Sequence, residues 1–374
     1  MKRKRFSTLR AWNRKRNYLM KDFRYYMRLL VAKLIWDKNR KNSFDINIIE
    51  SVLLLRNEGK IGDMIVDTIL LRELNKSGYQ VDVLATITNS IILKHNPYIR
   101  DIYLADNIDT PSFIKSYFHN IPEETINILK SNNYDLVIDT SLFDTPIHRL
   151  KLFKKINAKN VIGFNKEKWL NCYTKNICFD FNENHVKLTS REIMHALNKS
   201  VSNFNYDLYY PGEIDIKTQE IINELKSKSK RVIIINSFAG DAERCLSRVQ
   251  IKKITEKLRF IYKDISMVFL DHENKIDMTE FPSVYKYPSE SLYHTMSIIS
   301  QADLIISPDT SIVHISAAYK KPLIAIYQDF KSNKKLWEPG YDEAIQILAI
   351  NGKLHENEDI DDIIVESVKT IFPV

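Results

Sequence analysis

The sequence is poor in residues that mark several protein classes. Its 374 residues include only eight glycines and three cysteines, Cys172, Cys178 and Cys245. Three cysteines make neither an even disulfide set nor a CxxC metal pair, so we expect inert thiols in a reducing cytoplasm. The chain also lacks a GxGxxG fingerprint and a P-loop GK[ST], which argues against a nicotinamide-dependent oxidoreductase and a P-loop nucleotidase.

Long apolar runs are missing from the basic start of the chain. Its longest apolar stretch, "LLVA", is cut by Lys33, and about 20 apolar residues are needed to span a bilayer as a helix. No apolar segment with a small-residue cleavage site follows the first basic residues, so we do not expect a secretory signal.

Positive charge is confined to one end of the chain. Residues 1–42 hold fifteen Lys and Arg against two Asp, a local charge of +13, whereas the whole chain carries +8, so the remainder carries −5. This distribution argues against a body that binds nucleic acid and predicts a basic arm on a mildly acidic globule.

Apolar residues within this arm recur at helical spacing, at Phe23, Met27, Leu30, Val31, Leu34 and Ile35. A helix with basic residues and large apolar side chains is suited to the surface of an anionic membrane. The alternative is a helix that packs on the body and leaves a solvated basic face.

The rest of the chain alternates strand-like apolar runs with helical patterns. Its length exceeds what one hydrophobic core normally serves, and strands separated by helices predict a parallel sheet. One series precedes Pro211-Gly212, the best candidate linker, and a second follows it. We therefore predict an α/β fold with two Rossmann-like halves and an active site in a cleft between them. The predicted division is a basic amphipathic N-terminal arm over 1–44, an N-terminal Rossmann-like domain over 45–208 and a C-terminal Rossmann-like domain over 209–374.

The stretch "EGKIGD", which begins at Glu58, joins a predicted strand to a predicted helix. Gly59 and Gly62 permit positive φ angles and a close approach of another molecule, with Lys60 between them. Asp63 follows where the first N–H groups of the helix favour negative charge. The alternative role of Asp63 is to cap that helix.

A second strand-to-helix turn, "SPDTSIVHISAA", begins at Ser307. Asp309, Thr310 and Ser311 supply oxygens at the helix start, and His314 lies one turn inside. A diphosphate placed here would meet free N–H groups, hydroxyl groups and an imidazole. The alternative is a capped helix with a packed histidine.

Two further positions follow predicted strands of the second half. In "NSFAGDAERCLS", Ser237 and Gly240 can approach a phosphate, and Arg244 is a permanent cation. The alternative for Arg244 is an ordinary surface arginine. Glu273 follows the strand end in "FLDHEN", where the ribose of a nucleotide can lie.

The blocks "NEGKIGDMIVDTILLREL", "YDLVIDTS", "NVIGF", "INSFAGDAERCLS" and "ADLIISPDTSIVHISAAYKKPLIAIY" resemble, in order, those of glycosyltransferase family 9, the ADP-heptose:lipopolysaccharide heptosyltransferase family. The resemblance covers about residues 50–370 and omits the arm. It implies a GT-B fold in which the domain over 45–208 binds the acceptor and the domain over 209–374 binds the nucleotide-sugar donor. It also implies an inverting reaction without a metal and without a cofactor, with ADP-heptose as the donor substrate.

Residue by residue, the resemblance implies that Asp63 is the catalytic base, in a loop formed by Gly59, Lys60 and Gly62. It also assigns the donor turn to Asp309, Thr310 and His314, and a place near the donor phosphates to Arg244. Two departures concern the donor: Ser311 stands where glycine is usual, and "ERCLS" replaces a K-R-W-P-like sequence.

These observations predict transfer of heptose from ADP-heptose to a lipid-anchored lipopolysaccharide or lipooligosaccharide core, at the inner face of the bacterial inner membrane. Residues 1–42 would bind the anionic membrane, and no nucleic acid is expected as a partner. We expect the acceptor pocket within residues 85–190, with basic side chains such as Lys166, Lys168 and Lys187. The alternatives are another nucleotide sugar or a protein acceptor, an NAD-dependent oxidoreductase, and a catalytically silent binding protein.

Overall fold

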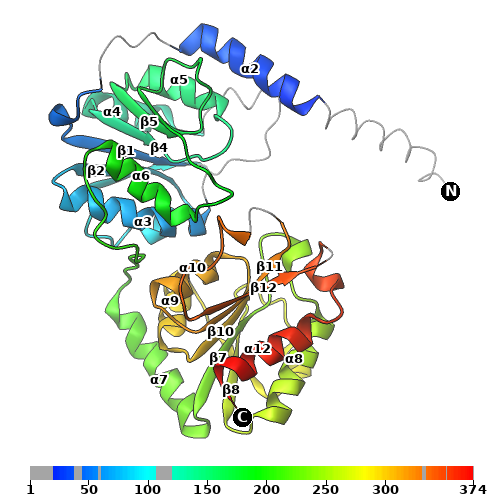
Figure 1. Cartoon of the computed structure of the whole chain (residues 1–374). Helices are drawn as coiled ribbons and strands as arrows, with labels where there is room; N and C mark the ends of the chain where they lie inside the picture. The colour runs from blue at the N-terminus through cyan, green and yellow to red at the C-terminus, as the bar shows by residue number, and fades with distance from the viewer. Residues whose placement is uncertain are drawn as a thin grey trace. The chain divides into compact units, whose positions relative to one another are not determined.

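The computed structural model describes residues 20–37, 44–57, 60–106, 120–330, 334–350 and 352–373. These residues form two six-stranded sheets with helices around them (Figure 1). The strand order is β3-β2-β1-β4-β5-β6 in the first sheet and β12-β11-β10-β7-β8-β9 in the second. Both orders read 3-2-1-4-5-6 when each sheet is numbered from its own first strand, which is the Rossmann order. The prediction of two Rossmann-like halves is confirmed.

The strands of the first sheet are β1 (Ser51–Arg56), β2 (Gln80–Thr86), β3 (Asp101–Ala105), β4 (Leu136–Asp139), β5 (Asn160–Phe164) and β6 (Lys175–Ile177). Those of the second sheet are β7 (Arg231–Asn236), β8 (Ile265–Leu270), β9 (Val284–Tyr287), β10 (Leu304–Pro308), β11 (Leu323–Gln328) and β12 (Ala344–Ala349). Central strands such as β1 and β10 are continuous apolar runs because helices cover both faces of a parallel sheet.

The helices are α2 (Lys21–Trp36), α3 (Ile61–Lys76), α4 (Glu123–Asn132), α5 (Ile147–Lys155), α6 (Thr189–Ala196), α7 (Gly212–Lys228), α8 (Arg248–Ile261), α9 (Leu292–Gln301), α10 (Ser311–Ala318) and α12 (Ile360–Ile371). The predicted helix in the basic arm is confirmed as α2, while residues 1–19 and 38–43 of the arm lie outside the described residues. The stretch "NSIILKHNP" over 89–97 has the sequence pattern of a short helix that Pro97 would end, but the structure forms only a 3-10 turn there, over Ser90–Ile92. The candidate linker Pro211-Gly212 is the start of α7.

The chain divides into two compact units that interleave along the sequence. The first unit contains the described residues up to 57, together with 82–86 and 103–178, and the second contains 60–81, 87–102 and 179–373. Helix α3 is thus counted with the second sheet. Since the units follow spatial contacts, the domain boundaries after residues 44 and 208 stay predictions.

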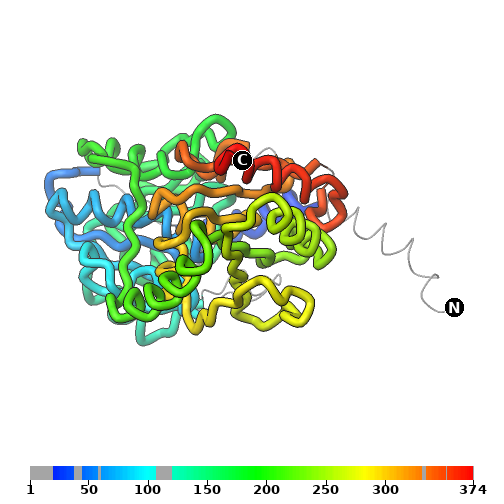
Figure 2. Tube along the Cα trace, turned by 90° about the horizontal axis from the view of Figure 1, so that it is seen from below, coloured from blue at the N-terminus to red at the C-terminus, as the bar shows by residue number. Residues whose placement is uncertain are grey.

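Each unit has its own apolar core. In the first, side chains of β1 and β4 pack with those of α4 and α5. In the second, α8 and α12 cover one face of the second sheet and lie side by side in both views (Figures 1 and 2). Within the described ranges, no helix is long and apolar enough to cross a membrane.

Candidate active site

The start of α3 holds the aspartate of the first turn. Lys60 precedes the helix in an extended conformation, and the half-buried Asp63 accepts a hydrogen bond from the Lys60 backbone N–H at 3.1 Å. The capping role considered for Asp63 is therefore present. A carboxylate has about four acceptor positions, so this one bond leaves Asp63 free to accept a proton from a bound hydroxyl group.

The side chain of His314 leaves no space for a Cβ atom at position 62, so only glycine fits there. A Cβ atom added at Gly62 would lie 2.8 Å from Cδ2 of His314, which is closer than real Cβ contacts come. The predicted close approach at Gly62 is thus made by a side chain of α10. Gly62 does not use the positive φ that glycine permits, because the residue is helical. Gly59 lies outside the described residues.

His314 is a buried, neutral imidazole. Burial lowers its pKa, and the charges of Asp309 and Asp63 oppose that shift without reversing it. The rings of Tyr206 and Trp337 lie edge-on to it, with centroids at 6.0 and 6.3 Å. His314 makes no hydrogen bond to any residue that the structure describes, so its ring nitrogens remain available to a ligand.

The start of α10 is built from the ends of two neighbouring strands. Thr310 caps the helix by accepting from the N–H of Ile312 at 3.2 Å, and Ser311 is the first helical residue. Asn236, at the end of β7, donates to the Ser307 hydroxyl at 2.9 Å and to Thr310 Oγ1 at 3.4 Å. This bridge holds the helix start at the carboxyl ends of β7 and β10, where parallel sheets bind ligands.

Arg244 reaches the same place from the 3-10 segment Ala242–Arg244. Its Nη1 donates to the backbone oxygen and to Oδ2 of Asp309, both at 3.1 Å. The guanidinium is only one quarter exposed, so Arg244 is not an ordinary surface arginine. The structure thus brings Arg244 and Asp309 together, although they are 65 positions apart.

Two other predicted donor residues differ in their surroundings. Ser237, which follows β7, is fully buried, and its hydroxyl has no hydrogen-bond partner among the residues described. Buried hydroxyl groups are normally hydrogen-bonded to protein groups or to ordered water, so the Ser237 hydroxyl is able to take up a further partner. Glu273 is half-exposed and forms an ion pair with Lys275. No contact among the described residues joins Glu273 to Arg244, Asp309 or His314.

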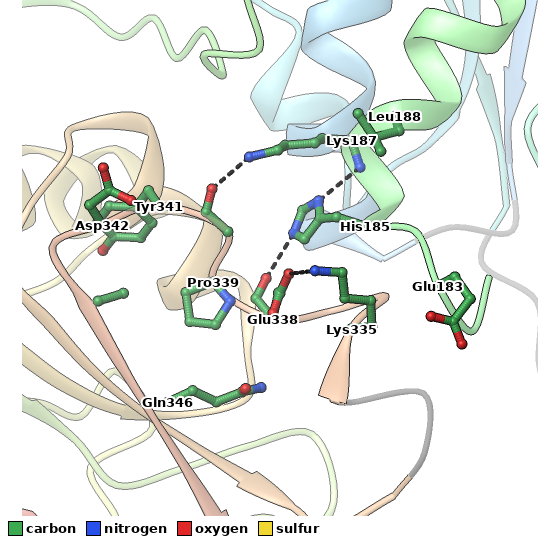
Figure 3. Close-up of a pocket in the computed structure, with 12 residues that line it drawn as sticks. Glu183, His185, Lys187, Leu188, Lys335, Glu338, Pro339, Tyr341, Asp342 and Gln346 are labelled. Atoms are coloured by element: carbon green, nitrogen blue, oxygen red, sulfur yellow. Dashed lines mark hydrogen bonds and ion pairs between the residues drawn. The ribbon is translucent and has the colours of Figure 1, made fainter. Parts of the chain in front are cut away.

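A pocket of about 470 Å³ lies in the same unit (Figure 3). It is lined by Glu183, His185, Lys187, Leu188, Lys335, Glu338, Pro339, Gly340, Tyr341, Asp342, Ala344 and Gln346. His185 accepts at Nδ1 from the N–H of Lys187 (3.0 Å), so its Nε2 is the nitrogen that donates to the Glu338 carbonyl at 2.8 Å. Lys187 Nζ donates to the carbonyl oxygen of Gly340 at 2.6 Å. These polar groups join two chain segments to each other, so we do not assign the pocket a ligand.

The lysines expected in an acceptor pocket do not all belong to the same unit. Lys187 belongs to the second unit and is bonded as described above. Lys166 lies in the first unit, where it donates to the Ser141 carbonyl at 2.8 Å and its Nζ lies 4.0 Å from buried Asp139. Lys168 is exposed. Because Lys166 and Lys187 belong to different units, their shared place in an acceptor pocket stays a prediction.

Sequence reasoning missed several residues that shape the candidate site. Asn236 bridges two strand ends, and Tyr206 and Trp337 enclose His314. Asn236 stands in the quoted turn, directly after a buried run, and that position was the available signal. Tyr206 and Trp337 lie in irregular segments with no motif around them. Across the described ranges, no group of three or more His, Cys, Asp or Glu side chains is arranged to hold a metal ion.

Comparison with known proteins bears on the resemblance stated above. Residues 278–363 match the family described as glycosyltransferase family 9 (heptosyltransferase). An Escherichia coli K12 protein, provisionally named lipopolysaccharide heptosyltransferase 4, is 22% identical over 311 residues, which cover 80% of this chain and 82% of that protein.

Solved structures share the fold. A family 9 glycosyltransferase from Veillonella parvula superimposes with a TM-score of 0.68 at 15% identity, covering 86% of this chain and 97% of that one. The Escherichia coli ADP-heptose lipopolysaccharide heptosyltransferase II gives 0.63 at 15% identity, covering 86% and 98%. The family match over residues 278–363, the curated relative and the shared fold bear out the resemblance to glycosyltransferase family 9.

Proposed function

We propose that this enzyme transfers heptose from ADP-heptose to a lipopolysaccharide or lipooligosaccharide core acceptor. The observation that carries the proposal is the cluster at the start of α10: a half-buried arginine on Asp309, and a buried neutral histidine packed against the helix start that bears Asp63. Support for the sugar comes from the names of the relatives, which refer to lipopolysaccharide heptosyltransferases and to ADP-heptose.

The proposed step is an inverting displacement at the anomeric carbon. An acceptor hydroxyl oxygen forms the new bond to that carbon, the bond to the diphosphate oxygen breaks, and ADP leaves with the electron pair. Asp63 takes the proton of the attacking hydroxyl group, which typically contributes ~10²–10⁴-fold. Its cap to Lys60 fixes the carboxylate in place before the acceptor arrives.

The leaving diphosphate gains negative charge and needs a prearranged positive environment. In our proposal the first N–H groups of α10, the Thr310 and Ser311 hydroxyl groups and the Arg244 guanidinium supply it. The Ser237 hydroxyl, which has no partner among the described side chains, gains one when the donor binds. His314 donates a hydrogen bond from its neutral ring to the donor. Glu273 remains a weaker proposal, as a ribose contact.

No metal enters this scheme, because the arginine and the helix start provide the positive charge. The enzyme works at the cytoplasmic face of the bacterial inner membrane, where its lipid-anchored acceptor lies. The basic segment 1–42 holds it on the anionic surface.

The direct test is incubation of the full-length enzyme with ADP-heptose and truncated core acceptors, followed by mass measurement of the product. We expect a mass increase of one heptose, in the presence of EDTA as well. A product only with a UDP-, GDP- or CMP-sugar would contradict the donor assignment. Activity lost with EDTA and restored by a divalent ion would contradict the metal-free scheme.

A further inference from the structure

Helix α2 has two apolar faces, and only one of them is packed. The packed face contains Leu29 and Ala32, which are fully buried in the core of the first unit beside α5. Tyr25 belongs to the same face: its hydroxyl donates to Glu167 Oε1 at 2.7 Å and accepts from the Thr145 N–H at 2.8 Å. A helix held by two buried side chains and by the hydrogen bonds of a partly buried hydroxyl group is a fixed part of this unit.

The end of α2 is fixed as well. Asp37, directly after the helix, accepts a hydrogen bond from the Asn171 N–H at 2.8 Å. Lys154 of α5 donates to the carbonyl oxygen of Ile35 at 3.0 Å, and Lys33 donates to the carbonyl oxygen of Trp169. These contacts fix the rotational orientation of α2 about its own axis. The same side of the helix therefore always faces away from the core of the first unit.

That outward side is also apolar. Phe23 is 58% exposed and Leu34 is 78% exposed. The exposed large apolar and aromatic side chains of α2 and of its N-cap residue are Met20, Phe23, Tyr26, Met27, Leu30, Val31, Leu34 and Ile35. Spacings of three and four place them along one stripe, which we call the outer stripe. The residues that the arm's sequence pattern singled out are therefore those that do not pack on the body.

The charged residues near the outer stripe indicate which kind of surface binds it. Lys21, Arg24 and Arg28 lie on the same helix, with Asp22 as the acidic exception, and residues 1–42 together carry +13. A second copy of the chain bound to the outer stripe would bring two positively charged segments together, and their charges would repel each other. An anionic bilayer offers an acyl region for the apolar stripe and phosphate groups for the cations.

We propose that the outer stripe of α2 inserts into the interface of an anionic membrane, so that the helix lies in the membrane plane with the first unit fixed to its inner side. This inference rests on the proposed function, which places the acceptor on a lipid anchor. It goes further, because α2 then fixes the orientation of the first unit on the membrane, which a flexible basic tether would not do.

The test is flotation of the full-length protein with vesicles of phosphatidylcholine and phosphatidylglycerol, and with phosphatidylcholine alone. We expect binding to the mixed vesicles only, with about a tenfold or greater loss in the double variant Phe23→Glu/Leu34→Glu. The matched control is Ile216→Glu, which changes an apolar side chain of α7 that is 65% exposed and should leave vesicle binding unchanged.

Transfer to a soluble acceptor is measured on the same preparations. The double variant should keep its thermal midpoint and this activity, because both side chains are exposed. Undiminished vesicle binding in the folded double variant would overturn the proposal. A dimer in the wild type that becomes a monomer in the variant, without vesicle binding, would show that a second copy covers the stripe. Failure of transfer with normal vesicle binding would instead contradict only the proposed reaction.

Discussion

The second unit contains two buried histidines that look alike until their hydrogen bonds are compared. His185 and His314 are 4% and 5% exposed. Burial lowers the pKa of His185 to about 3 and also lowers that of His314. Each ring is closed against a glycine, Gly340 or Gly62, at which an added Cβ would lie under 3 Å away. Both imidazoles are therefore neutral and tightly enclosed.

The two histidines differ in the hydrogen bonds that their ring nitrogens make. Both ring nitrogens of His185 are bonded to backbone groups, so that ring joins two chain segments. His314 has no hydrogen bond within the part of the chain that the structure describes, and the charges of Asp63 and Asp309 act on it. A buried histidine with a shifted pKa is thus not by itself a functional one. A buried histidine whose ring nitrogens have no hydrogen-bond partner among the described residues, and which lies beside charged groups, is the better candidate for a functional residue.

The largest expected effect comes from the carboxylate next to His314. Asp63→Asn should lower the rate of transfer by about 10²–10⁴-fold, because the amide cannot take the proton of the acceptor. The amide oxygen can still accept from the Lys60 N–H, so the fold and donor binding should persist. Near-normal transfer by the folded variant, measured by product mass over time, would reduce Asp63 to a helix cap.

The two histidines should respond oppositely to one substitution. His314→Gln should lower kcat/KM by about tenfold or more while changing stability less. His185→Gln should cost about 1–3 kcal/mol of unfolding free energy, because buried backbone partners are left unsatisfied, and leave kcat per folded molecule within about twofold. Urea unfolding and transfer assays on both variants provide the comparison. A reversal of the two effects would place the site at the His185 pocket.

The close packing of Gly62 against His314 can be tested by comparison with Gly212, where the structure leaves space for a Cβ atom. Gly62→Ala puts a methyl group 2.8 Å from the ring, which should cost about 1–3 kcal/mol and reduce activity with it. Gly212→Ala, at the start of α7, has no atom within 4 Å and should be neutral or stabilising by up to about 1 kcal/mol. Equal unfolding free energies for the two variants would contradict the close packing of His314.

The smallest effect concerns pH. Because the folded pKa of each histidine lies below the unfolded value of about 6.5, the unfolded chain takes up these protons before the folded chain does as pH falls below about 6.5. The stabilisation is complete above that pH and is lost on acidification towards pH 3 for His185. From pH 6.5 to 5.5 the unfolding free energy should fall by about 1 kcal/mol through His185, and His314 should contribute in the same direction. An unchanged slope in His185→Gln would contradict this assignment.

Much of the fold was predictable because central strands are buried on both faces. Runs such as those of β1, β7 and β10 contain little besides apolar residues. The missed strands β6, β9 and β12 are edge strands, whose short, mixed sequences carry a weak pattern. The nine-residue helix α5, with its several basic residues, was missed as well.

The candidate site was predictable as turns but not as contacts. The turns containing Asp63, Arg244 and Asp309 follow buried strands, so their positions at strand ends could be read from the chain. The contacts themselves depend on packing between segments that are remote in sequence. Two examples are the ion pair of Arg244 with Asp309 and the packing of the His314 ring of α10 against Gly62. The partly buried role of α2 was likewise hidden, because Leu29 and Ala32 belong to a second apolar face.

The most direct test of the account is thermal shift of the enzyme with ADP, UDP, GDP, CMP and NAD. We predict that ADP alone raises the melting temperature, that Arg244→Ala loses most of this shift and shows a raised donor KM, and that His185→Gln retains the shift. A shift with NAD, or an ADP shift that survives Arg244→Ala and disappears in His185→Gln, would contradict the account.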